Sequence, residues 1–155
     1  MEKRSHHEWV HLPYRRGVQM LEENGVRVLG QTSATLSAWA GISHAEGQPL
    51  QVYGILLVEH DQKHLQVHAA FFRRIGQRDK IRFLSRFFQQ AFARWVECDR
   101  FSFSETPVVH LGHSPKGVML SRDMDLTTWI RGRLAKPGRT VCRGKDEGAP
   151  RRKTA

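Results

Sequence analysis

The clearest capacity for chemistry lies in the run Arg73-Arg74-Ile75-Gly76-Gln77-Arg78-Asp79-Lys80. This run opens a predicted helix, whose unpaired N–H groups attract anions, and Gly76 would let an anion approach the backbone closely. The helix dipole disfavours cations at this end, so a bound phosphate would account for the crowding of positive charge. Two alternatives stay open: a basic turn exposed to solvent, and a helix end whose N–H groups Asp79 satisfies.

The net charge of +10 is concentrated in two parts of the chain. Residues 73–100 carry eight Lys/Arg against three acidic residues, and residues 131–155 carry nine against two. The other two segments, 1–72 and 101–130, each have a net charge of −1. Such clustering favours a surface that binds a polyanion. A solvated face with a disordered basic tail is the alternative.

Several side chains could make this contact. Placed at 100° per residue, Arg82 and Arg86 fall on the same flank of the predicted helix as Arg78. Trp39 lies beside Ser37 on the expected polar face of a strand, where an exposed tryptophan suits stacking on a nucleic-acid base. Core packing is the alternative explanation for the strand aromatics. We therefore expect phosphate and base contacts from seven side chains: Arg73, Arg74, Arg78, Lys80, Arg82, Arg86 and Trp39.

The nine histidines raise the question of a metal site. His64 and His68 would share one face of a strand about 13 Å apart, which is too far for a single ion. His110 and His113 could present two imidazoles near a turn, but no acidic residue or cysteine close in sequence completes a site. We therefore expect exposed or hydrogen-bonded histidines and no metal. Cys98 ends an amphipathic helix, which is typical of a core residue and not of a nucleophile.

The elements that must position these residues follow from the hydrophobic periodicity. Apolar residues recur at intervals of three and four over 78–98, which predicts a long amphipathic helix. Shorter helices are expected at 15–24 and from Asp123 or Asp125 to near Ala135. Period-two and aliphatic runs predict strands at 36–42, 50–58, 64–72, 101–105, 107–111 and 118–121.

This order of elements predicts an α+β fold, in which a mainly antiparallel sheet packs against one long amphipathic helix with short flanking helices. The connections are expected to be too short for parallel crossovers. Residues 1–136 would form one globular domain, and residues 137–155 a disordered basic tail, because the tail has little to bury. Oligonucleotide-binding barrels and double-stranded-RNA modules are similar in element order alone.

A different expectation comes from residues 63–105, where a strand is followed by Arg-x-x-Gly-x-Arg, a long amphipathic helix and another strand. This arrangement resembles the pyrophosphate-binding turn of the GNAT acyltransferases, which holds acetyl-CoA. The resemblance implies acetyl-CoA binding at residues 73–78. Arg78 stands where the family's usual turn has its second glycine, and Asp79 would repel a phosphate.

Charge and motifs together predict a non-catalytic nucleic-acid-binding or accessory protein without a cofactor, a subunit of a larger bacterial complex. The alternatives are a GNAT-like acyltransferase and a basic adaptor that docks on an acidic protein partner. Two cysteines are too few for a disulfide framework, so a reducing, cytoplasmic location is expected. The longest apolar run, residues 54–58, is too short to span a membrane, and the N-terminus has no apolar stretch typical of a secretory signal. No membrane partner is therefore expected.

Overall fold

The fold is α+β, as the order of elements predicted. The computed structural model describes residues 5–45, 47–72, 75–105, 107–112, 117–120 and 125–134. Its strands are β1 (Ser5–Leu12), β2 (Arg27–Gly30), β3 (Thr35–Ala45), β4 (Gln51–His60), β5 (His64–Phe71), β6 (Arg100–Glu105), β7 (Val108–Leu111) and β8 (Val118–Met119). Its helices are α1 (Tyr14–Glu23), α2 (Gln77–Arg94) and α3 (Leu126–Arg133). Arg73, Arg74, His113 and the predicted tail at 137–155 lie outside the described residues.

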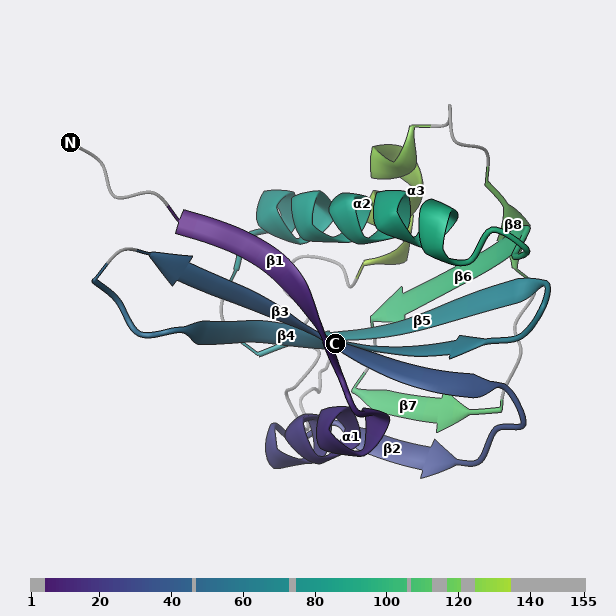
Figure 1. Ribbon diagram of the computed structural model, residues 1–155, viewed down its shortest axis with the longest axis horizontal. Helices are drawn as coiled ribbons and strands as arrows, with labels where there is room; N and C mark the ends of the chain where they lie inside the picture. The colour runs from purple at the N-terminus through teal and green to yellow at the C-terminus, as the bar shows by residue number, and fades with distance from the viewer. Residues whose placement is uncertain are drawn as a thin grey trace, which may run out of the picture.

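The described elements form three layers (Figure 1). Six strands make the central sheet, in the order β1-β3-β4-β5-β6-β8. Helices α2 and α3 cover one face of this sheet, while α1 and the two-stranded sheet of β2 and β7 lie on the other face. Each face therefore has its own apolar core.

The central strands are buried on both faces, which the sequence pattern only partly indicated. In β4, Leu56 and Val58 belong to the core under α2, while Ile55 and Leu57 belong to the core on the α1 side. All four side chains are fully buried. Successive side chains of a strand point to opposite faces, so an unbroken aliphatic run requires cover on both sides. The expectation that residues 36–42 form a half-buried strand is wrong for the same reason, because β3 is also covered twice.

The tryptophans all lie on the α2 side of the sheet. Trp9, Trp39 and Trp95 are buried in that core, and Trp129 of α3 packs against it. The Trp9 Nε1 donates a hydrogen bond of 2.9 Å to the Phe83 carbonyl, which ties β1 to α2. This layer is therefore built largely from ring edges packed against ring faces.

Most strand pairs are antiparallel, but two are parallel. Strand β5 pairs with β6 in parallel over residues 64–69 and 100–105, and β2 pairs with β7 in parallel. The expectation that the connections are too short for parallel crossovers is wrong. The segment that joins β5 to β6 contains all of α2, whose 18 residues are long enough to return the chain to the same edge. The sheet is thus mainly antiparallel around one β–α–β unit.

Strand β1 was not predicted from the sequence. β1 forms an edge of the sheet and pairs only with β3. Polar residues outnumber apolar ones in β1, so neither a period-two nor an aliphatic run identified it. The last strand, β8, pairs with the first two residues of β6.

Two helical glycines give a matched test of this packing. A Cβ at Gly17 of α1 would collide with the Cβ of Ala38 on β3, whereas a Cβ at Gly132 of α3 meets no atom within 4 Å. We expect Gly17→Ala to lower the free energy of unfolding by about 1–3 kcal/mol through overpacking. Gly132→Ala should leave it unchanged or raise it by up to about 1 kcal/mol, because alanine favours the helix. Denaturant unfolding of both variants measures these changes, and an unaffected Gly17→Ala would contradict the packing of α1 on β3.

Candidate nucleic-acid interface

Three arginines lie on one exposed face of α2. Arg78, Arg82 and Arg86 are each four residues apart, and all three are exposed. The opposite face of the helix is apolar and buried, so packing against the sheet fixes the direction of the arginine face. A helix rises 1.5 Å per residue, so the three Cα atoms span about 12 Å along the axis. We call these three residues the arginine face.

The arginine face lines a shallow groove between α2 and the start of α3. The groove has a volume of about 400 Å³, and the polar side chains of Ser85, Gln89 and Thr127 line it together with the arginines. The same three polar residues also line an adjoining groove of about 350 Å³, which reaches Asp125. Asp125 caps α3 by accepting a hydrogen bond from the Thr127 N–H. Cationic and neutral hydrogen-bonding groups therefore lie side by side along one surface.

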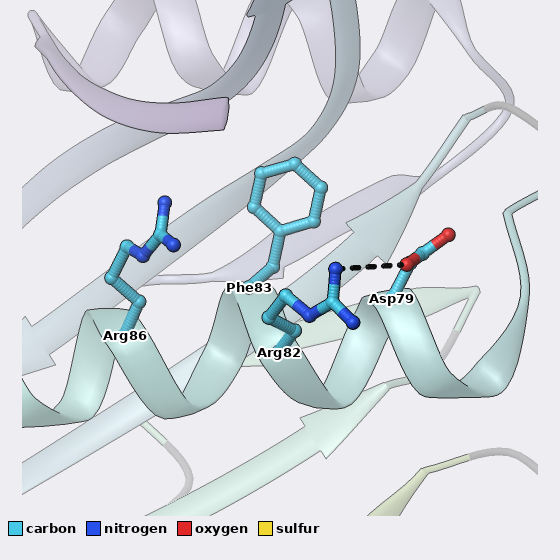
Figure 2. Close-up of a pocket in the computed structure, with 4 residues that line it drawn as sticks. All are labelled: Asp79, Arg82, Phe83 and Arg86. Carbon is cyan, nitrogen blue, oxygen red and sulfur yellow. Dashed lines mark ion pairs between the residues drawn. The ribbon is translucent and has the colours of Figure 1, made fainter. Parts of the chain in front are cut away.

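Arg82 also contacts an acidic residue of the same helix. Its Nη1 lies 3.9 Å from the Asp79 Oδ1, and the two side chains are 63% and 58% exposed. In Figure 2 the Arg82 guanidinium is turned toward Asp79, and the Phe83 ring lies between Arg82 and Arg86 in this view. An exposed pair of this kind contributes at most about 1 kcal/mol, so an incoming phosphate can compete with it.

The start of α2 has no side-chain cap. Gly76 is the N-cap residue with φ −71° and ψ 159°, and as a glycine it has no side chain with which to cap the helix. A Cβ at Gly76 would meet nothing within 4 Å. Asp79 lies in the first turn, where its charge complements the helix dipole. Arg73 and Arg74, which the sequence places just before this helix end, lie outside the described residues.

Lys80 does not belong to the arginine face. Its Nζ donates a hydrogen bond of 2.9 Å to the Glu105 Oε2, and it lies 5.3 Å from the centre of the Phe71 ring. The Lys80 side chain is 17% exposed and that of Glu105 is 1% exposed. The structure therefore places Lys80 between α2 and the ends of β5 and β6, where it neutralises a buried carboxylate.

Trp39 is buried, and the expectation that it lies exposed on a polar strand face is wrong. It is 9% exposed, because α2 covers this face of β3. Its ring makes edge contacts with Phe87 and Trp95, and Arg94 stacks over both tryptophans at 5.0 and 5.4 Å. Arg94 was not singled out from the sequence, because only the fold brings Trp39 beneath the end of α2. The covered ring offers no open face on which a base could stack.

The two helical layers differ sharply in charge. Helix α1 carries two arginines and two glutamates. Helices α2 and α3 together carry seven Lys/Arg, five in α2 and two in α3, against the single acidic residue Asp79. Arg131 and Arg133 of α3 are exposed, as is the arginine face. A polyanion would therefore be attracted to the α2–α3 side of the molecule.

Two of the histidines that suggested a metal site, His64 and His68, contact polar side chains of the protein. The His68 Nε2 lies 2.7 Å from the Glu59 Oε2, and the His64 Nε2 lies 3.0 Å from the Ser102 Oγ. His110 is exposed on β7. Within the described ranges, no three His, Cys, Asp or Glu side chains are grouped so that they could hold a metal ion.

Comparisons with protein-family models, with curated proteins and with solved structures gave no match to this chain. In the part of the chain that the structure describes, no helix is both long enough and apolar enough to cross a bilayer.

The different settings of Lys80 and Arg82 can be tested by stability. Lys80→Met would remove the charged hydrogen-bond donor that Lys80 supplies to the buried Glu105 carboxylate, and we expect it to lower the free energy of unfolding by about 2 kcal/mol. Arg82→Met removes an exposed pair and should change it by less than about 1 kcal/mol. Urea unfolding at neutral pH measures both. Equal effects of the two substitutions would show that Lys80 does not act as the partner of a buried charge.

Proposed function

We propose that this protein binds nucleic acid without catalysis, through contacts between the arginine face of α2 and the phosphate backbone. The observation that carries the proposal is the fixed, exposed repeat of Arg78, Arg82 and Arg86 along a helix that the sheet holds in place. A guanidinium offers a planar pair of N–H donors that matches two phosphate oxygens.

The dimensions of the arginine face suit a polyphosphate chain. It spans about 12 Å of helix axis, and one strand of B-form DNA presents about one phosphate per 3.4 Å of its own axis. Each of the three guanidinium groups can therefore meet a phosphate of its own. Gln89 and Thr127 line the same groove and would add neutral hydrogen bonds. Contacts of this type position a protein on the backbone and carry no sequence information directly.

Charge outside the described residues would strengthen this binding. Arg73 and Arg74 precede α2 in the chain, and residues 135–155 carry seven Lys/Arg against two acidic residues. Each phosphate that a cation neutralises releases condensed counterions, which favours association at low salt. In this proposal the protein is an accessory subunit of a larger complex in the cytoplasm, and both DNA and RNA are candidate ligands.

Binding to labelled single- and double-stranded DNA and RNA across a salt series tests the proposal. We expect the logarithm of the affinity to fall linearly with the logarithm of salt concentration, with a slope of about 0.7–0.9 per phosphate contact. The double variant Arg78→Gln/Arg82→Gln should bind more weakly at low salt, and its slope should be shallower by about that amount for each lost contact.

A matched control is available on the opposite side of the molecule. Arg15 and Arg16 of α1 are also exposed and adjacent to no acidic residue in sequence, so Arg15→Gln/Arg16→Gln removes the same charge. This control should bind almost as the unmodified protein does. If the two double variants weakened binding equally, the loss of affinity would be explained by net charge alone. That result would overturn the arginine face as a site. Binding of acidic proteins with no binding of any nucleic acid would favour the adaptor alternative.

One observation supports a second candidate, the GNAT-like acyltransferase. Strands β5 and β6 are parallel neighbours joined by α2, and Gly76 begins that helix without a side-chain cap. A β–α–β unit whose helix start lies beyond the ends of its strands is a common setting for a bound phosphate group. Two features weigh against this candidate. Strands β5 and β6 stay paired side by side along residues 64–69. The Lys80–Glu105 ion pair fills the space where the two strands end, which is where the cofactor would have to bind.

Thermal unfolding with acetyl-CoA separates the two candidates. A ligand that binds only the native state raises the melting temperature by mass action. For a nucleic-acid-binding protein without a cofactor, we expect no saturable increase with acetyl-CoA. The control is an equal concentration of a simple polyphosphate, which the arginine face would also attract. A saturable increase that is specific to acetyl-CoA would make the acyltransferase the leading function.

A further inference from the structure

A polar cavity lies on the face of the sheet opposite to α2. Its volume is about 200 Å³, and it is bounded by the turn between β4 and β5, by residues 31–34 after β2, and by Gly112 after β7. Gln66 of β5 lies in its wall, on the same face as the buried Ala70 of the α1-side core. The cavity is therefore separated from the arginine face by the whole thickness of the sheet. Its side-chain lining is almost entirely polar: Gln31, Thr32, Ser33, Glu59, Asp61, His64 and Gln66.

Glu59 gives this cavity a buried negative charge. Its carboxylate accepts hydrogen bonds from the His68 Nε2 at 2.7 Å and the Gly112 N–H at 2.8 Å, and Thr32 adds a side-chain hydrogen bond. Burial alone would raise the pKa of Glu59, but these hydrogen bonds outweigh it and hold the pKa below its ordinary value. Glu59 is therefore ionised at neutral pH.

Asp61 supplies a second carboxylate in the lining. Its Oδ1 accepts hydrogen bonds of 2.7 Å from the backbone N–H groups of Lys63 and His64. These hydrogen bonds lower the pKa of Asp61, so it too is ionised at neutral pH. Both of these hydrogen bonds end on Oδ1, so they leave the Oδ2 atom of Asp61 available to a ligand. A cavity in a strongly basic protein is thus lined by two carboxylates.

Gln66 independently indicates that something polar belongs in the cavity. The residue is only 8% exposed, and its side-chain amide makes no hydrogen bond with any described residue. It lines both this cavity and a neighbouring one of about 140 Å³ on the β6 side. The amide faces the space of the cavity, where water or a ligand can hydrogen-bond to it. A molecule inside the cavity would satisfy the Gln66 amide.

We propose that this cavity binds a small organic cation, an ammonium or guanidinium compound with a few carbon atoms. The two carboxylates select a positive charge and form charge-assisted hydrogen bonds with its N–H groups. The Gln66 carbonyl oxygen accepts a further N–H. The volume of about 200 Å³ suits a small ligand. This site goes beyond the proposed function, since its ligand has the opposite charge and its position is on the opposite side of the sheet.

Thermal unfolding of the full chain with small probes tests this site. Methylammonium, 1,4-diaminobutane and methylguanidinium are compared with succinate and 1,4-butanediol, which are similar in size but negative and neutral. The charged probes are used as chloride or sodium salts, and all samples, including that with butanediol, are brought to the same ionic strength. We expect at least one of the cations, and neither succinate nor butanediol, to raise the melting temperature saturably. No increase with any cation, or an equal increase with succinate, would overturn the proposal.

Two variants connect the effect to the cavity. Gln66→Leu removes the unpaired amide and should not destabilise the fold, because an apolar side chain replaces a buried group without partners. Asp61→Asn keeps an oxygen acceptor for the turn but loses the charge. Each should weaken binding of the cation by about tenfold or more, measured by calorimetry. Gln62→Leu is the control: Gln62 is exposed in the same turn and does not line the cavity. Unchanged affinity in Gln66→Leu would show that the cation binds elsewhere.

Discussion

The rest of the structure depends on the need of β3, β4 and β5 for apolar cover on both faces. Leu56 and Leu57 are adjacent in the chain and fully buried, yet they belong to different cores. One layer of helices cannot bury both, so the chain must place elements above and below the sheet. Helix α2 covers one face and α1 covers the other.

This arrangement gives the molecule two electrostatically distinct sides. The side covered by α2 and α3 presents cations to solvent over an apolar and aromatic interior. On the other side, Glu59 holds the β2–β7 pair to the main sheet by accepting the Gly112 N–H and the Thr32 side chain. The Glu59 carboxylate, which holds β2 and β7 to the main sheet, is also one of the two carboxylates that make the cavity negative. Because the sheet separates the two sides, ligands of opposite charge can be bound without competing for one surface.

Local patterns predicted the parts of the structure that depend on neighbouring residues. The spacing of apolar residues located α2 to within a few residues and placed Arg78, Arg82 and Arg86 on one flank, where the structure brings them together. The aliphatic runs located β4 and β5. These features need only the geometry of one element. The α+β class followed from the order of such elements.

Contacts between distant residues could not be predicted in this way. Lys80 was grouped with the arginines because its partner Glu105 is 25 positions away. Trp39 was expected in solvent because a strand pattern does not reveal whether a helix will cover its second face. The cavity is assembled from residues after β2, β4 and β7 around Gln66, so no local motif marks it. In the sequence, the cavity is indicated only by Gln66, a polar residue within the largely apolar strand β5.

The segregation of the four tryptophans has a spectroscopic consequence. All of them lie in or against the core beneath α2 and α3, and none belongs to the core beneath α1. Indole emission therefore reports on one half of the molecule only. If the α1 layer separated first during unfolding, far-ultraviolet circular dichroism would change while the emission maximum stayed constant. Coincidence of the two signals is thus a direct measure of whether both cores melt as one cooperative unit.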